Sequence, residues 1–521
     1  MGRRQKLSVW GVFTLVFMLE LAVGYYLTDV YGFMSGDAMS RVANAFYTLY
    51  SRFPGLANIG FVWNPLPSLL ELPLLVLYPV YPEIASSGLA AVFMTSLFAA
   101  LTAGMLVRAG IRFGMKPWLS ITFALLYALN PYIFYYGANG LTESIFITFI
   151  TMAVVQLLLW IQKDDMFPIS IIAFMLAFGF WTRYEAVPLG IAFAGAVMLV
   201  NLRMRNSALS LSERLYKTEG SLIVLLTPAV FSGLLWIFFN YTIMGDALYF
   251  LHSSYSNLGQ AELIKNNEVF AALTNHPVRT LAFVARKMSY FCMPVALIAM
   301  IRLCERRLFQ TDFVILLLLA FAIPAMQFVL LLKGASAAWI RYYMYPLPIA
   351  IAWLPYEWSM MKYRKTWSAL AVVALLASSV VLTMAMNNPK VASDEYEAFH
   401  RNKLYREQEA KREVAAYLRE RLPNARILTD SFSSFGVIMS SRMPKQFIMT
   451  SDRDFESSLA EPRTHNVDYI LLPNPVAVLA LDQVNRSYPE LYANGADWVS
   501  LEREFGEYWK LYKVKADPKV S

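Results

Sequence analysis

Residues 178–190 read FGFWTRYEAVPLG and place Arg183 and Glu185 between two apolar runs. The runs, 167–181 and 186–200, are each shorter than the roughly 20 residues that a helix needs to cross a bilayer core. Because an unpaired charge at membrane depth costs at least about 2.5 kcal/mol, both side chains are expected to face protein, water or an anionic ligand. The stretch therefore predicts a hairpin of two short helices with a polar apex.

The composition of the whole chain is typical of a membrane protein with many spans. Of the 521 residues, 57% are hydrophobic and 16% are charged, which is more apolar surface than a soluble chain of this length can bury. The net charge of +8 comes from short basic clusters between apolar segments. Such clusters are topology signals and argue against nucleic acid as a partner. Two cysteines form no disulfide framework, which favours a prokaryotic plasma membrane.

Eleven segments are long and apolar enough, or nearly so, to span a membrane. If the N-terminus is cytoplasmic, every inner loop carries Lys or Arg, whereas each short outer loop carries at most one. Residues 64–82, NPLPSLLELPLLVLYPVYP, are left out as a proline-broken re-entrant or interfacial helix, because a span there would invert this alternation. The predicted spans are 8–28, 86–107, 117–135, 141–160, 167–181, 186–201, 220–240, 281–301, 311–332, 344–361 and 366–386.

This topology divides the chain into a membrane domain, 1–387, and an extracytoplasmic soluble domain, 388–521. The membrane domain has two large outer loops, 29–85 and 241–280. In the soluble domain, the short apolar runs RILTD, QFIMTS and DYILLP alternate with helix-like stretches, which predicts a small α/β fold. The expected fold class is therefore a polytopic α-helical membrane protein with about 11 transmembrane helices and a C-terminal α/β domain.

Two carboxylates on the predicted outer face are candidates for chemistry. Asp37 begins the amphipathic stretch 35–52; it either complements the first helical turn, paired with Arg41 one turn on, or acts as a catalyst. Glu143 lies where a helix enters the bilayer from outside. It either complements that helix N-terminus or faces a polar cavity at the membrane boundary.

Two arginines on the same face are candidates for binding an anion. For Arg183 we favour a ligand role because guanidinium groups match phosphate oxygens, whereas Glu185 suits a salt bridge. Arg341 precedes a late span and has tyrosines around it, including Tyr342. It is either an interfacial anchor or the second arginine of a lipid-phosphate site.

The outer loop 239–260 interleaves hydroxyl, amide and imidazole groups with aromatic rings. Such a mixture suits sugar recognition by hydrogen bonding and ring stacking, with His252 and Tyr255 as the candidates. A solvated loop is the alternative interpretation.

The order and sidedness of these motifs resemble the GT-C integral-membrane glycosyltransferases, and among them the family 39-like group of protein O-mannosyltransferases and aminoarabinose transferases. The resemblance covers about residues 1–386 and rests on GDAMSR, TES, WTRYEA and RYYMYPLP, which begin at residues 36, 142, 181 and 341. It implies a sugar donor linked to polyprenyl phosphate, inverting transfer and an active site on the non-cytoplasmic face. The acceptor would be a glycan, a lipid or a protein.

The resemblance also implies roles for individual residues. Asp37 matches the family's catalytic carboxylate and would be the general base, with Glu143 as the second catalytic candidate. Arg183 and Arg341 match the basic residues that contact the carrier phosphate. The remaining candidates for substrate contact are Arg41, Glu71, Glu185, His252, Tyr255 and Tyr342.

A divalent metal, Mg²⁺ or Mn²⁺, is an open expectation. Several relatives carry a second acid beside the first, whereas Ala38 and Met39 follow Asp37 here. Glu71 or Glu143 would have to supply the second carboxylate through space.

Two other functional classes, a transporter and an assembly protein, are alternatives to a glycosyltransferase. A transporter or flippase for a lipid-linked or anionic substrate would show paired interrupted helices in an inverted repeat. The sequence shows one interrupted hairpin and no matching second half. An assembly protein would instead depend on its outer domain, 388–521, and not on Asp37.

Overall fold

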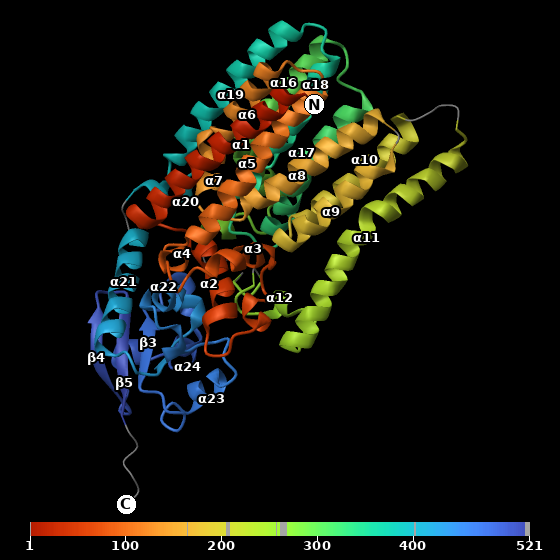
Figure 1. The fold of residues 1–521 in the computed structure, drawn as a ribbon. Helices are drawn as coiled ribbons and strands as arrows, with labels where there is room; N and C mark the ends of the chain where they lie inside the picture. Colours follow the sequence, from red (N-terminus) through yellow and green to blue (C-terminus); the bar gives the residue numbers. More distant parts are fainter. Residues whose placement is uncertain are drawn as a thin grey trace, which may run out of the picture. The chain divides into compact units, whose positions relative to one another are not determined.

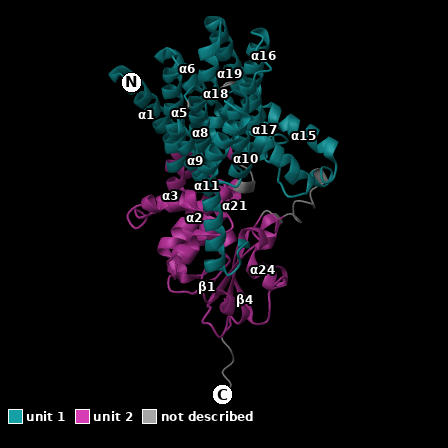
Figure 2. Ribbon diagram, turned by 90° about the vertical axis from the view of Figure 1, so that its right-hand side faces the viewer, with its two compact units in different colours: residues 1–23, 94–249, 264–396 teal, residues 24–93, 250–263, 397–521 magenta. Residues whose placement is uncertain are grey.

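The computed structural model describes residues 2–163, 165–204, 209–256, 258–260, 268–400 and 403–515. The chain forms two compact units (Figure 2). Unit 1 comprises residues 1–23, 94–249 and 264–396, and unit 2 comprises residues 24–93, 250–263 and 397–521. Unit 2 therefore contains the whole first predicted outer loop, 29–85, together with the C-terminal part of the chain, and this grouping differs from the predicted division at residue 387.

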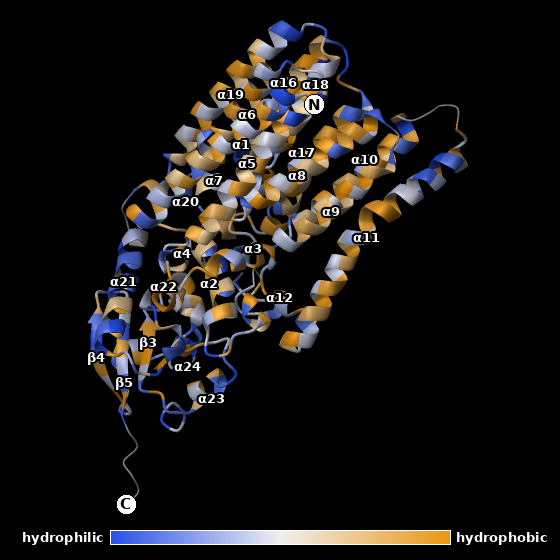
Figure 3. Ribbon diagram, in the orientation of Figure 1, coloured by the Kyte–Doolittle hydropathy of each residue, from blue (hydrophilic) through white to orange (hydrophobic). Residues whose placement is uncertain are grey.

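Unit 1 is built from apolar helices, as the hydropathy colouring shows (Figures 1 and 3). Within the described residues, seven helices are long and apolar enough to cross a membrane, or up to nine if two bent pairs each count as one span. The seven are α1 (Arg3–Tyr25, extended to Val30), α5 (Leu89–Arg112), α8 (Glu143–Gln162), α10 (Ala186–Leu199, extended to Met204), α11 (Leu211–Met244), α17 (Thr311–Leu332) and α19 (Arg364–Met386).

Each of the eleven predicted spans coincides with helix, although two of the helices are short. Helix α9 (Met166–Thr182) has 17 residues and α18 (Pro346–Met360) has 15, so the total of eleven spans stays a prediction. The second arm of the hairpin is longer than predicted, because α10 continues as a π-helical turn through Met204 and reaches 19 residues.

The two bent pairs correct the picture of straight spans at 117–135 and 281–301. Helices α6 (Pro117–Ala128) and α7 (Pro131–Ala138) meet at 71°, and α15 (Pro277–Ser289) and α16 (Met293–Cys304) meet at 87°. A proline stands at the start of the second helix in each pair. It removes an N–H donor and blocks continuation of the preceding helix. At the first bend, the side chain of Asn130 also caps α7 by accepting from the N–H of Tyr132.

A buried ion network holds α16, α17 and α18 together. The guanidinium of Arg302 donates both Nη atoms to Asp312, at 2.6 and 2.8 Å, and Nε to Glu357 at 2.7 Å. Arg307 donates to the other oxygen of Glu357 at 2.7 Å. Arg302 is fully buried and is the counter-charge that both carboxylates share, although Glu357 also pairs with Arg307.

Replacing Arg302 by Met is therefore expected to destabilise the protein strongly, since Asp312 and Glu357 lose their shared counter-charge. Breaking a buried ion pair from one side costs about 3–5 kcal/mol. Thermal unfolding of the detergent-solubilised protein measures the effect. Arg306, an exposed arginine just after the end of α16, provides the matched control, and equal losses in R302M and R306M would contradict this role for the network.

Unit 2 contains the short helices of the first outer loop. They are α2 (Gly36–Tyr50), α3 (Leu66–Leu75) and α4 (Glu83–Ser86), with the 3₁₀ turn Leu56–Ile59. Helix α3 falls within the stretch 64–82 that was left out of the span count. With ten residues it is too short to cross a core of about 30 Å, and Pro73 lies near its end.

The C-terminal part of unit 2 is the predicted α/β fold. Its five-stranded sheet has the order β2-β1-β3-β5-β4; β1, β2 and β3 are parallel, and β5 pairs antiparallel with β3 and β4. The strands are β1 (Ile427–Leu428), β2 (Phe447–Ile448), β3 (Tyr469–Pro473), β4 (Val499–Phe505) and β5 (Trp509–Val514). The helices are α21 (Lys403–Arg421), α22 (Ser431–Ser441), α23 (Phe455–Ala460), α24 (Gln483–Ser487) and α25 (Leu491–Asn494).

Specific polar contacts join the first outer loop to this α/β part within unit 2. Arg52 makes a bidentate ion pair with Asp454, at 3.1 and 2.8 Å. The hydroxyl of Tyr78 donates to the main-chain oxygen of Met439 at 3.4 Å. Helix α2 also packs on α22. These contacts explain why segments about 400 residues apart in sequence form one compact unit.

Candidate functional site

The apex of the α9–α10 hairpin places Arg183 among partners of opposite charge. Helix α9 ends at Thr182 because Arg183 has extended backbone angles, φ −154° and ψ 144°. One Nη atom of Arg183 donates to Glu143 at 2.8 Å and to Thr142 at 2.9 Å, and the other donates to Glu185 at 2.7 Å. The salt bridge expected for Glu185 is therefore present, and it includes Arg183 and Glu143 as well.

Glu143 is the first residue of α8 and is fully buried. In this position its charge complements the N-terminal end of the helix dipole. The same carboxylate lies between two arginines, since Arg341 Nε approaches it to 3.5 Å. The two interpretations of Glu143 are thus compatible: one carboxylate complements the start of α8 and also faces a polar cluster.

Arg341 lies in the 3₁₀ turn Ile340–Tyr343 that precedes α18. Its guanidinium carbon lies 4.1 Å from the ring centre of Trp339 and 5.8 Å from that of Tyr342, distances that suit cation–π contact. Its second carboxylate neighbour is Asp394, at 3.9 Å. Because the residue is only 3% exposed, it does not extend outward as an interfacial anchor does.

Several polar atoms in this cluster receive no partner from the described residues. They are Glu143 Oε2, Arg183 Nε and the hydroxyl of Tyr345, and all three are buried. Tyr345 lies close enough to interact electrostatically with Arg183, Glu143 and Glu185. Since an unsatisfied buried polar group costs about 1–3 kcal/mol, these atoms favour water or a ligand in the cluster.

Sequence reasoning missed Glu395, which lies beside this cluster in unit 1. Its Oε1 accepts hydrogen bonds from the hydroxyls of Tyr132 and Tyr136, each at 2.6 Å. The signals were present: two tyrosines at i and i+4 in PYIFYYGA, and acids directly after the last predicted span, in SDEYE. The predicted boundary at residue 388 assigned those acids to the accessory domain.

The remaining candidates lie in unit 2. Asp37 is the second residue of α2 and is exposed, so the predicted first-turn position is confirmed. The guanidinium carbon of Arg41 lies 5.6 Å from the ring centre of Trp63, and the main-chain oxygen of Arg41 accepts from the hydroxyl of Ser68. Glu71, one turn on from Ser68 in α3, is buried, and Arg41 is its charged neighbour. The structure thus brings Arg41 near Glu71, and the catalytic role of Asp37 stays a prediction.

The loop candidates His252 and Tyr255 also belong to unit 2. His252 ends the short helix α12 (Tyr249–His252) and is exposed. The hydroxyl of Tyr255 donates to the buried carboxylate of Asp430 at 2.7 Å, and its ring lies 4.6 Å from that of Phe432. The α/β fold therefore holds Tyr255 in place, and sugar contact by these two residues stays a prediction.

Another carboxylate, that of Asp482, lies near Asp430 in the α/β part. Asp482 is also buried and accepts from the hydroxyl of Ser433. Burial, followed by the nearby charge of Asp430, raises the pKa of Asp482 to about 7. A carboxyl with this pKa ionises only partly at neutral pH.

The expectation of a divalent metal stays a prediction. Within the described ranges, no group of three or more His, Cys, Asp or Glu side chains is arranged to hold one. In unit 1, Glu143 already faces two guanidinium groups, which repel a cation. The proposed mechanism uses neither Mg²⁺ nor Mn²⁺.

Residues 80–236 match the family model described as dolichyl-phosphate-mannose-protein mannosyltransferase. The matched segment is about a third of the chain and contains Glu143, Arg183 and Glu185, but neither Asp37 nor Arg341. The match confirms the predicted resemblance over this segment.

Two solved structures of the Archaeoglobus fulgidus oligosaccharyltransferase are similar to the chain. The apo form aligns with a TM-score of 0.43 and 11% identity over 89% of this chain and 70% of that one. The second, called AglB and solved with an inhibitory peptide and a dolichol-phosphate, aligns with a TM-score of 0.44 and 12% identity over 93% and 71%. A comparison with curated proteins found no match.

Proposed function

We propose that the protein transfers a sugar from a polyprenyl-phosphate-linked donor to an acceptor on the non-cytoplasmic face of the membrane, with inversion at the anomeric carbon. The observation that carries the proposal is the arginine–carboxylate cluster at the hairpin apex, where Arg183 and Arg341 share Glu143. Part of this cluster lies in the segment that matches a family whose description includes a dolichyl-phosphate sugar. The acceptor is a glycan, a lipid or a protein.

The two guanidinium groups suit the charge that develops during transfer. As the bond between the anomeric carbon and the phosphate oxygen breaks, the departing polyprenyl phosphate gains negative charge. Preorganised Arg183 and Arg341 stabilise that charge, because fixed donors cost no reorganisation as the reaction proceeds. Glu143 and Glu185 orient Arg183 through bonds of 2.8 and 2.7 Å. They also offset its charge, which limits how tightly the product phosphate is held.

Asp37 is the proposed general base, as the resemblance implies. An acceptor hydroxyl is a poor nucleophile at neutral pH, so a carboxylate that removes its proton during attack accelerates transfer. The new bond joins the acceptor oxygen to the anomeric carbon, and the proton passes to the Asp37 carboxylate. Inversion follows because the attacking oxygen approaches opposite the departing phosphate.

The fate of the donor tests the proposal. Purified protein in liposomes that contain sugar-radiolabelled polyprenyl-phosphate mannose, together with an envelope extract as the acceptor source, is expected to release polyprenyl phosphate and label an acceptor. A flippase would move the donor between leaflets with its sugar–phosphate bond intact. If the donor crosses the bilayer uncleaved while no acceptor is labelled, the transferase proposal is wrong. Polyprenyl-phosphate glucose and aminoarabinose extend the panel to other sugars.

A further inference from the structure

A cavity in unit 1 lies beside the arginine–carboxylate cluster. Its volume is about 140 Å³, close to that of an engineered cavity of about 150 Å³ that binds one benzene molecule. One six-membered ring is therefore the size of group that it accommodates. Its walls comprise Phe270, Phe283, Lys287, Ala337, Ala338, Trp339, Ile340, Lys390, Val391, Ser393 and Glu395.

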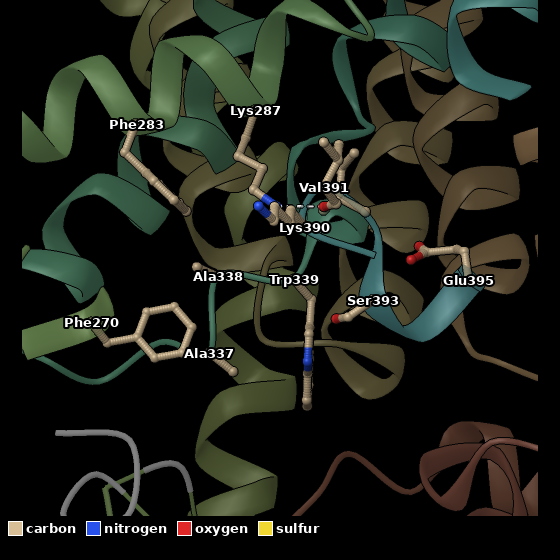
Figure 4. A pocket seen from close by; sticks show the side chains of 11 residues that line it. Phe270, Phe283, Lys287, Ala337, Ala338, Trp339, Lys390, Val391, Ser393 and Glu395 are labelled. Atoms are coloured by element: carbon tan, nitrogen blue, oxygen red, sulfur yellow. Dashed lines mark hydrogen bonds between the residues drawn. The ribbon is translucent and has the colours of Figure 1, made fainter. Parts of the chain in front are cut away.

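The walls combine aromatic surface with a small number of polar groups (Figure 4). Phe283 and Lys287 project from α15 on one side, and Ser393 and Glu395 come from α20 (Ser393–Phe399) on the other. Trp339 lies between these two sides. Aromatic and aliphatic side chains that surround placed polar groups occur in sites for small organic ligands.

Glu395 is held in one orientation at this cavity. It is 2% exposed, and both tyrosine hydroxyls donate to the same oxygen, Oε1. Among the described residues, Oε2 receives no hydrogen bond, although it is not enclosed by protein atoms. A fixed carboxylate with one accessible oxygen is an acceptor for hydroxyl or ammonium donors.

One side chain lies both in the wall of the cavity and against the proposed phosphate site. Trp339 lines the cavity and also lies 4.1 Å from the guanidinium carbon of Arg341. In the donor, the sugar ring is bonded directly to the phosphate. A ring whose phosphate contacts Arg341 therefore falls within reach of the cavity. The Glu395 carboxylate in the cavity wall can accept hydrogen bonds from sugar hydroxyls.

We infer that this cavity binds the sugar ring of the carrier-linked donor, with Glu395 accepting hydrogen bonds from its hydroxyl or amino groups and Trp339 stacking on it. Tyr132 and Tyr136 are positioning residues that fix the Glu395 carboxylate. The inference rests on the proposed function. It assigns direct contact with the donor sugar to Trp339 and Glu395, which lie outside the segment that matches the mannosyltransferase family.

The experiment compares binding of bare polyprenyl phosphate with binding of the same carrier bearing mannose, glucose or aminoarabinose. The wild type is expected to bind at least one sugar-bearing carrier roughly 10-fold more tightly than the bare carrier, because hydrogen bonds to a charged group are stronger than those between neutral groups. Glu395→Gln is expected to lose that preference while its affinity for the bare carrier stays unchanged. Tyr132→Phe, which removes one of the two bonds that fix Oε1, is expected to lose part of it.

A second variant keeps the test independent of the buried carboxylate. Ala337→Leu adds bulk to a cavity wall without touching Glu395, and it is expected to lose the sugar preference in the same way. If Glu395→Gln and Ala337→Leu both keep the preference, or lose affinity equally for bare and sugar-bearing carriers, the inference is wrong. A wild type that binds carriers but prefers no sugar also overturns it, whereas a wild type that binds no carrier overturns the proposed function instead.

Discussion

Asp37→Asn is expected to reduce sugar transfer at least about 100-fold, because a positioned general base contributes 10²- to 10⁴-fold to such reactions. The substitution keeps the shape of the side chain and removes only its charge. Asp37 is exposed in the first turn of α2, so the loss of its dipole interaction costs only about 0.3–1 kcal/mol. Initial rates of transfer from labelled donor, measured with an unfolding curve for each preparation, separate the two effects.

The chain supplies a matched control for the helix-dipole interpretation of Asp37. Glu213 is another exposed acid in a first helical turn, where it completes a capping box with Ser210 at the start of α11. Glu213→Gln is expected to lower stability by a similar small amount and to leave the transfer rate unchanged. Full activity of Asp37→Asn would show that its carboxylate serves α2 alone.

The polar cluster at the hairpin apex could be predicted from the sequence for two reasons. An unpaired charge at membrane depth costs free energy, and the predicted topology fixes on which face of the membrane each charged side chain lies. An arginine between two short apolar runs must find acids, and Glu143 and Glu185 were the acids that topology placed on the same side. The structure brings these residues together with Arg341 in unit 1. Asp37 belongs to unit 2, so its place beside them stays a prediction.

Hydropathy alone did not predict the bends in the α6–α7 and α15–α16 pairs or the ion network around Arg302. A window of apolar residues reports how favourable insertion is, but not whether the chain changes direction within it. The sharp breaks before Pro131 and near Cys292 therefore appeared as continuous spans. Arg302 was interpreted only as part of a basic inner loop, although the structure buries it against Asp312 and Glu357.

Glu395 was missed for a different physical reason. The membrane domain was predicted to end at residue 387, where hydropathy falls. In the structure, the compact unit 1 extends through residue 396. The nine residues 388–396 that follow the last apolar segment supply Ser393 and Glu395 to the cavity wall. Hydropathy marks where the apolar environment ends, and packing continues beyond that point.

Arg183→Met is expected to weaken binding of bare polyprenyl phosphate by roughly 10- to 100-fold, which corresponds to about 1.5–3 kcal/mol for hydrogen bonds to a charged group. The same substitution leaves Glu143 and Glu185 without the guanidinium that both now contact. An uncompensated buried charge costs about 3–5 kcal/mol of stability. The single variant therefore cannot distinguish a phosphate-binding arginine from one that only neutralises two acids.

A comparison of three variants makes that distinction. The double variant Glu143→Gln/Glu185→Gln removes the two acids, and the triple variant adds Arg183→Met. Because the triple variant no longer buries the carboxylates of Glu143 and Glu185 without their guanidinium partner, its unfolding temperature is expected to recover relative to the single variant. If Arg183 binds the carrier phosphate, the triple variant still binds polyprenyl phosphate about 10-fold or more weakly than the double variant. Equal affinities in the double and triple variants would show that Arg183 only holds the hairpin apex together, and would leave Arg341 as the remaining cation for the phosphate.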